Sequence, residues 1–208
     1  MRFLKYNEFL NESLDSSEID EVIIQWIDQK TSTSKLNSIS NFLLSKKKDI
    51  QELAKTNPEK YLSPNNETCY RGLEKVSDKE FVIDSIKRKR FELTKAPGFD
   101  GYIDAIKIDN YPYDPTRNSQ SWSIDPDVAW RFSNSGLILE TVINSDFVMN
   151  PQYTSKINQK INSSGASSGL SEEEVIHLGK SYKNISLYID INSIDEDDIL
   201  YPYIEEFQ

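Results

Sequence analysis

Three consecutive glutamates, Glu172, Glu173 and Glu174, stand at the entrance to a short apolar run. The run predicts a strand over Glu174–Leu178, in which side chains alternate between two faces. Glu172 and Glu174 then project from one face and Glu173 from the other. Two carboxylates on one face repel each other, and such a pair suits a site where it meets a cation or takes part in chemistry. The alternative is a solvated acidic strand end, and partners elsewhere in the chain must decide between the two interpretations.

Two other segments supply candidate partners for these carboxylates. Thr68–Leu73 is rich in residues that favour strands, and it holds Arg71. The planar guanidinium group of an arginine suits a phosphate, although an arginine whose charge reaches solvent from an edge strand is the commoner case. Ser121-Trp122-Ser123 lies in a second strand-like stretch, and Asp125-Pro126 directly after it has the N-cap and first-turn proline of a helix.

The composition excludes several kinds of catalytic site. Cys69 is the only cysteine and His177 the only histidine among 208 residues, so neither an intramolecular disulfide nor a zinc site built from several cysteines or histidines can form. His177 faces away from Glu174 in the predicted strand, and we expect it to have a structural role. The net charge of −10 argues against general binding of nucleic acid. The basic run at residues 87–90 is the best candidate for contact with an acidic partner or RNA.

The N-terminal residues show no signal for export or membrane insertion. No apolar run approaches the roughly 18 residues of a membrane span, and residues 1–13 lack the apolar core of a signal peptide. We therefore expect a cytoplasmic protein. Residues 1–13 are amphipathic, which predicts a first helix packed on the domain. They also resemble the N-terminal packaging peptides of proteins carried inside tailed-phage heads, which would place the protein in the virion.

The remaining pattern predicts a helical lobe (residues 1–60) followed by a mixed core (residues 61–208). Apolar residues recur at helical spacing from residue 17 to a stop at Asn57-Pro58. Strands are predicted at residues 68–73, 102–108, 118–124, 137–143, 174–178 and 185–191, with helices at residues 77–86 and from residue 125. Strict alternation over residues 185–191 predicts a half-buried strand. Trp130 and Phe132 are expected in the core.

The order of the three motifs resembles the signature of a known enzyme family. Arg71 on a first strand, Ser121 and Ser123 in a Ser-x-Ser strand, and Glu172 and Glu174 in Glu-x-Glu resemble the Arg, Ser-Thr-Ser, Glu-x-Glu pattern of the arginine-specific mono-ADP-ribosyltransferases. That family includes the clostridial binary-toxin enzyme components and the Alt and Mod enzymes of T-even phages. The resemblance covers about residues 68–191, and Trp122 replaces the usual threonine. It implies an α+β fold, with a helical lobe followed by two facing, mostly antiparallel sheets that form an NAD cleft. No Gly-x-Gly-x-x-Gly motif follows a predicted strand, which agrees with this fold rather than a doubly wound one.

The resemblance also implies roles for the motif residues. Glu174 would stabilise the oxocarbenium-like ribose that forms as nicotinamide leaves NAD, and Glu172 would position or deprotonate an acceptor arginine. Arg71 would bind the NAD phosphates. The other residues assigned to the NAD site are Tyr70, Gly72, Ser121, Trp122 and Ser123, with the Ser121 hydroxyl orienting Glu174.

The implied function is NAD-dependent ADP-ribosylation of an arginine on a host or cellular protein. NAD is the substrate, no metal is required, and the enzyme is expected to be a monomer. Host transcription or translation machinery is a candidate acceptor, although residues 163–168 lack the aromatic residue with which relatives often recognise their acceptor. One alternative is an NAD glycohydrolase, in which water replaces the acceptor. Another is a catalytically idle phage internal or structural protein that keeps the fold.

Overall fold

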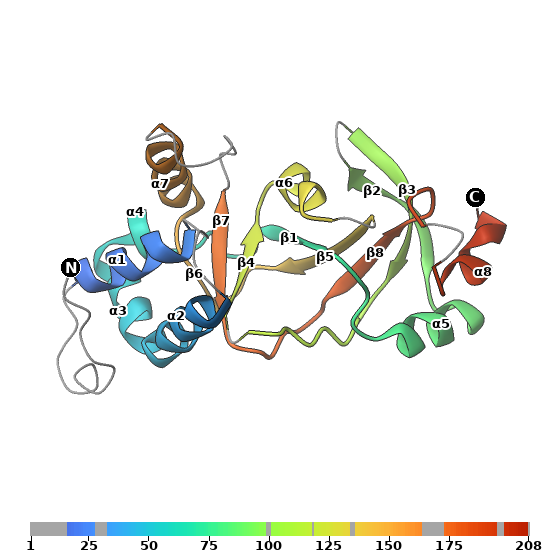
Figure 1. Cartoon of the computed structure of the whole chain (residues 1–208), viewed down its shortest axis with the longest axis horizontal. Coiled ribbons are helices and arrows are strands. Elements are labelled where there is room, and N and C mark those ends of the chain that lie inside the picture. Colours follow the sequence, from blue (N-terminus) through green and yellow to red (C-terminus); the bar gives the residue numbers. More distant parts are fainter. Residues whose placement is uncertain are drawn as a thin grey trace.

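The computed structural model describes residues 16–27, 33–98, 101–117, 119–133, 136–163, 173–194 and 198–207. The proposed packaging segment, residues 1–13, and the acceptor-side Glu172 therefore lie outside the described residues. A sheet crosses the middle of the molecule, with helices α1, α2, α3, α4 and α7 at one end and α5 and α8 at the other (Figure 1). Of the described helices, none has the length and apolar character needed to cross a membrane.

The first third of the described chain is helical, as the apolar spacing predicts. Its helices are α1 (Ser16–Ile27), α2 (Thr33–Ser45), α3 (Lys47–Thr56) and α4 (Pro58–Tyr61). A later helix that the sequence analysis does not foresee, α7 (Pro151–Ser163), packs with them. Their shared core also includes Ile176 and Leu178, which come from the sheet. The helical lobe therefore rests directly on the strand that carries Glu174.

Eight strands form one sheet in the order β2-β3-β8-β5-β1-β4-β7-β6, and every neighbouring pair among the described residues is antiparallel. The strands are β1 (Thr68–Leu73), β2 (Glu92–Gly98), β3 (Gly101–Ile108), β4 (Ser119–Ser123), β5 (Leu137–Val142), β6 (Phe147–Val148), β7 (Glu174–Leu178) and β8 (Ser186–Asp190). The fold is α+β, as expected. The two separate facing sheets of the expectation are instead one hydrogen-bonded sheet.

The pairing between neighbouring strands of the sheet is shortest between β1 and β4. Strand β1 pairs with β5 over six residues, from Thr68 to Leu73, whereas its described pairing with β4 is the single pair Tyr70 and Ser123. The direction of strands β4 and β7 also differs strongly from that of β1, β5 and β8 (Figure 1). Beyond the pair Tyr70 and Ser123, strands β1 and β4 diverge, and we call the opening between them the fork. The fork separates the sheet into two differently oriented halves without breaking it.

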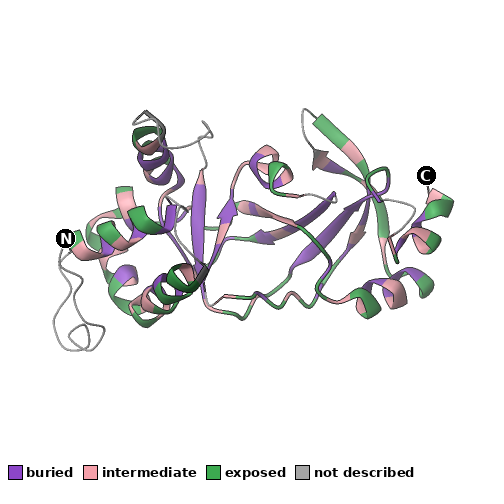
Figure 2. Ribbon diagram, viewed as in Figure 1, coloured by how far each residue is buried: buried purple, intermediate pink, exposed green. Residues whose placement is uncertain are grey.

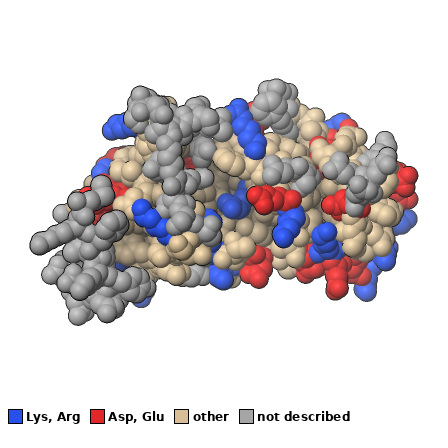
Figure 3. All heavy atoms as spheres, viewed as in Figure 1, with Lys and Arg blue, Asp and Glu red and all other residues tan. Residues whose placement is uncertain are grey.

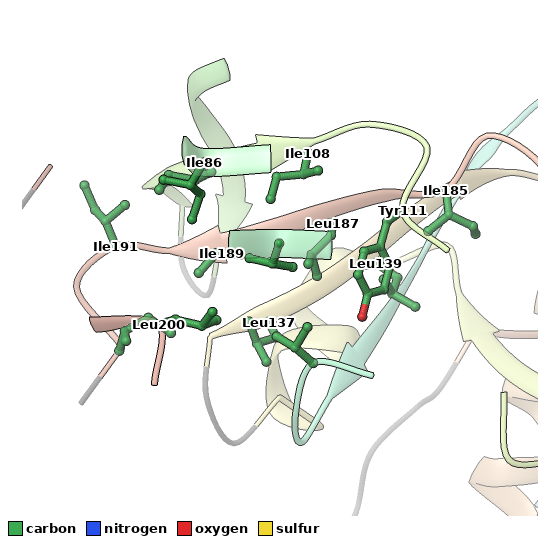
Figure 4. Packing of buried hydrophobic residues seen from close by; sticks show 14 of the residues in the cluster. Ile86, Ile108, Tyr111, Leu137, Leu139, Ile185, Leu187, Ile189, Ile191 and Leu200 are labelled. Atoms are coloured by element: carbon green, nitrogen blue, oxygen red, sulfur yellow. The ribbon is translucent and has the colours of Figure 1, made fainter. Parts of the chain in front are cut away.

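The larger core lies between the sheet and the C-terminal end of the molecule. Leu139 of β5 and Leu187 and Ile189 of β8 are fully buried, and they converge there with Ile86 of α5 (Lys79–Lys87) and with Leu200 (Figure 4). Strands β7 and β8 are buried along their length, β1 is mostly half-buried, and the helices expose one side (Figure 2). The final helix, α8 (Tyr201–Ile204), and the turn after it close this core.

Strand β8 corrects one prediction, because all five of its residues are buried rather than half of them. Its second face is covered by a cluster in which Tyr188 packs with Ala129 and Ile138. The polar side chains on this face have partners: the Tyr188 hydroxyl donates to Glu140 at 3.0 Å. Alternating polarity therefore marks a face with paired polar groups here, and not a solvated one.

The basic run at residues 87–90 has local partners. Acidic side chains gather toward the end of the molecule that carries α5 and α8 (Figure 3). Arg88 and Arg90 both form ion pairs with Asp84, and the Lys87 ammonium lies 5.0 Å from the centre of the Tyr203 ring. The two ion pairs stay within α5 and the residues just after it, and the Lys87 contact joins α5 to α8. These contacts favour a structural use of the run.

Candidate functional site

A cleft of about 510 Å³ lies in the fork between β1 and β4. It is lined by Tyr70, Arg71, Gly72, Leu73, Glu74, Lys75 and Ser77 on the β1 side, and by Tyr113, Asp114, Thr116, Arg117, Ser119, Gln120, Ser121, Trp122 and Ser123 on the β4 side. Helices contribute Trp26, Leu36, Val128, Ala129 and Phe132, and β7 contributes Glu174. All the residues that the sequence assigns to the site therefore line one cleft, apart from Glu172, which is not described.

Strands β4 and β7 place one carboxylate and two hydroxyls on the same face. Glu174 lies directly opposite Ser123, and Ser121 lies opposite Ile176. Opposite residues of an antiparallel pair share a face, and so do residues two apart along a strand. Glu174 is only 3% exposed, which is rare for a glutamate. A buried carboxylate thus shares a cleft wall with Ser121 and Ser123.

The backbone of Glu174 is held from the helical lobe. Strand β6 pairs with β7 at His177 and Ile176 and ends at Val148. Thr154 of α7 occupies the next position, where its Oγ1 accepts a hydrogen bond from the Glu174 N–H at 3.0 Å. The same oxygen lies 2.9 Å from the Glu174 carbonyl oxygen, to which it can donate.

Arg71 bridges the fork. Its Nη1 donates a hydrogen bond to the backbone carbonyl of Ser121 on the opposite strand. Its Nε is buried, and within the described part of the chain it has no acceptor. Buried donors nearly always have partners, so this one favours an acceptor supplied by a ligand. A guanidinium group makes short, strong hydrogen bonds to phosphate.

The charges of the cleft differ from those of the whole chain. Among the described residues that line it, three are cationic, Arg71, Lys75 and Arg117, and three are carboxylates, Glu74, Asp114 and Glu174. The described lining is therefore formally neutral, whereas the whole chain has a net charge of −10. An anionic ligand would meet less repulsion in this cleft than elsewhere on the protein.

Gly72 allows helix α6 (Pro126–Arg131) to approach β1. A Cβ atom at Gly72 would lie 2.2 Å from the Ala129 carbonyl oxygen and 2.7 Å from the Ser133 nitrogen. The helix begins beside Ser123, whose Oγ accepts a hydrogen bond from the Asp125 N–H at 3.0 Å. Ser123 therefore supports the turn into α6, and α6 forms one wall of the cleft.

Trp122 and His177 lie on the opposite face of the same strands. Trp122 is 1% exposed, and its ring packs against Tyr113, Phe147 and Tyr182. The His177 ring stacks on Tyr182 with centroids 3.9 Å apart, and burial lowers its pKa to about 4. This packing agrees with a structural role for His177. The Trp122 indole supports the cleft from the core, away from the face that carries Glu174.

Two aromatic residues of the cleft have positions or contacts that the sequence does not predict. Phe132 was expected in the core, but it is 45% exposed and lines the cleft, because α6 ends one residue before it. Trp130, by contrast, is half-buried, packs against a small core cluster and donates to the Pro97 carbonyl oxygen. Trp26 of α1 donates its indole N–H to Ser121 Oγ at 2.9 Å, a contact that helical spacing alone does not predict. The available signal was the indole N–H itself, which needs an acceptor when buried.

Comparison of the chain with protein-family models, with curated proteins and with solved structures gives no match. Among the described residues, no group of three histidine, cysteine, aspartate or glutamate side chains is placed to hold a metal ion.

Proposed function

We propose that the chain binds NAD in the cleft and transfers its ADP-ribose to an arginine of another protein, as a mono-ADP-ribosyltransferase. One observation carries the proposal: Arg71, Ser121 and Glu174 come from three different strands and line the same cleft. These are the residues to which the family resemblance assigns phosphate binding, orientation of the catalytic glutamate and catalysis.

The size and the charged groups of the cleft support the binding of NAD. Its volume of about 510 Å³ lies within the range of roughly 300–1,000 Å³ that is usual for small-molecule sites. Arg71 supplies guanidinium donors for the pyrophosphate. Glu174 supplies a negative charge in a buried setting, where it interacts more strongly with a nearby cation than it would in water.

In the proposed reaction the bond between the ribose C1′ and the nicotinamide nitrogen breaks, and nicotinamide leaves with the bonding electron pair. Glu174 stabilises the positive charge that develops on the ribose. A guanidinium nitrogen of the acceptor arginine then attacks C1′, and its proton passes to Glu172 and on to water. Glu174 serves the first step and Glu172 the second.

An NAD glycohydrolase is the second candidate. The described cleft contains the residues assigned to breaking the glycosidic bond, and these suffice if water is the acceptor. Purified protein should be incubated with NAD labelled in the adenylate phosphate, with and without cell lysate, while nicotinamide release is measured. Labelled protein with ADP-ribose mapped to an arginine supports the transferase. Nicotinamide release without protein labelling supports the glycohydrolase. If no nicotinamide is released and NAD does not bind, the enzyme proposal is wrong and the idle structural protein is favoured.

A further inference from the structure

Trp26 connects the helical lobe to the cleft through one hydrogen bond. Its indole N–H donates to Ser121 Oγ at 2.9 Å, across 95 residues of sequence, and both residues line the cleft. We propose that Trp26 is a positioning residue, which fixes the direction of the Ser121 hydroxyl for the reaction. This inference rests on the proposed function, because it concerns a step at the same site.

The polarity of the bond determines where the Ser121 proton can go. A serine hydroxyl has one proton and rotates to suit its partners, whereas an indole N–H can only donate. Ser121 must therefore accept from Trp26, and its own proton points away from the indole. Glu174 lies on the same face and in the same cleft. The Ser121 proton is thus available to the Glu174 carboxylate or to a hydroxyl of a bound ribose.

The indole itself is held firmly. Trp26 is 4% exposed and packs in the core of the helical lobe. Asp20, on the same helix α1, accepts hydrogen bonds from Lys60 Nζ at 2.8 Å and from the Tyr61 hydroxyl at 2.6 Å. These contacts fix α1 against α4. The helical lobe therefore contributes a rigid donor to the cleft.

The other contact of Ser121 does not depend on Trp26. The Ser121 carbonyl that accepts from Arg71 belongs to the backbone of β4, which pairs with β7 over five residues. Loss of the indole N–H frees the hydroxyl to rotate but leaves this carbonyl in place. The reaction step should therefore suffer while NAD binding through Arg71 is retained.

The test uses Trp26→Phe, Ser121→Ala and the double variant, with Trp130→Phe as the matched control. Trp130 also loses an indole N–H bond, to the Pro97 carbonyl, but has no contact with Ser121. We expect Trp26→Phe to lower kcat for nicotinamide release about fivefold, the effect of one lost hydrogen bond, with KM for NAD unchanged within about twofold. In the Ser121→Ala background the same change should have no further effect. Trp130→Phe should keep the wild-type kcat.

If Trp26→Phe does not fold, 3-benzothienylalanine at position 26 keeps the ring shape and replaces the N–H with sulfur, and it should show the same loss. Equal kcat for wild type and the position-26 variants, or full multiplication of the two losses in the double variant, overturns the positioning role. In that case the proposed function stands as long as the wild type releases nicotinamide. A wild type that releases none overturns the proposed function and the positioning role together.

Discussion

The Oγ1 atom of Thr154 lies 3.0 Å from the backbone nitrogen of Glu174 and 2.9 Å from its carbonyl oxygen. Thr154 is fully buried on α7, at the position where β6 would continue if it ran past Val148. A side chain thus takes the place of a strand beside the proposed catalytic glutamate. The sheet can end here without leaving the backbone of Glu174 unpaired.

Thr154→Val should lower both stability and activity. Valine keeps the shape of threonine but removes the hydroxyl, so that the buried Glu174 N–H loses its acceptor and the Glu174 carbonyl loses a donor that it shares with the Pro151 carbonyl. The expected cost is about 1–3 kcal/mol. Thr154→Ser, the matched control, should retain most of both properties. Urea denaturation and nicotinamide release measure the two effects. Equal behaviour of the valine and serine variants would show that the hydroxyl does not hold Glu174.

Glu174→Gln should abolish transfer and NAD hydrolysis while the fold remains intact. A neutral amide cannot balance the positive charge of the ribose in the transition state. Nicotinamide release and circular dichroism test the two parts of this expectation. Glu173→Gln is the control, because strand alternation places this neighbour on the other face. Nicotinamide release from Glu174→Gln at nearly the wild-type rate would contradict the assignment.

Glu172→Gln should separate the two activities. The glycosidic bond can still break, and water can still attack, so slow NAD hydrolysis should persist while arginine modification is lost. Protein labelling and nicotinamide release, measured on the same samples, give the ratio of transfer to hydrolysis. An equal loss of both activities would favour a glycohydrolase, or a different alignment of the Glu-x-Glu motif.

Arg71→Lys should weaken NAD binding at least tenfold, since a hydrogen bond to a charged group contributes about 1.5–3 kcal/mol. Lysine keeps the charge but lacks the planar fork of donors. Isothermal titration calorimetry measures the affinity, and the melting temperature should change little. Arg88→Lys, directly after α5 and paired with Asp84, is the control outside the cleft. The same NAD affinity for the Arg71 variant and wild type would remove the phosphate-binding role.

The buried His177 should make the folded protein less stable at acidic pH. Burial lowers its pKa from 6.5 to about 4, so between these values the unfolded chain binds the proton more readily than the folded one. The stability present above about pH 6.5 should fall by about 3 kcal/mol as the pH decreases toward 4. His177→Phe keeps a ring beside Tyr182 and should lose this part of the dependence. Urea denaturation of both proteins between about pH 7 and about pH 4 measures the difference, and parallel curves would contradict the prediction.

The sequence predicted the elements with strong patterns and missed those without them. β1 and β7 match the predicted segments residue for residue. Helix α7 was not predicted because most of its residues are polar. Its only large apolar side chains are Tyr153, Ile157 and Ile161. Strand β2 contains Lys95 and Pro97, which weaken a strand signal, and it exists through its pairing with β3.

The candidate site was predictable in its residue types but not in its full lining. Arg71 and Ser121 face each other because β1 lies next to β4, a neighbour relation that local patterns do not contain. The contribution of the helical lobe was hidden for the same reason. Trp26 has the burial that its spacing predicts, but which atom accepts its N–H depends on how α1 docks on the sheet.

Strand β2 forms one edge of the sheet, and its backbone hydrogen-bonding groups affect whether the protein can self-associate. Open strand edges are templates on which a second chain can add a strand and begin aggregation. Pro97 has no N–H to offer such a chain, and its carbonyl is occupied by the Trp130 indole. At the opposite edge, β6 is only two residues long. Both edges of the sheet thus oppose the addition of a strand from a second chain. At β2 this protection depends on a tryptophan from α6, which occupies the Pro97 carbonyl.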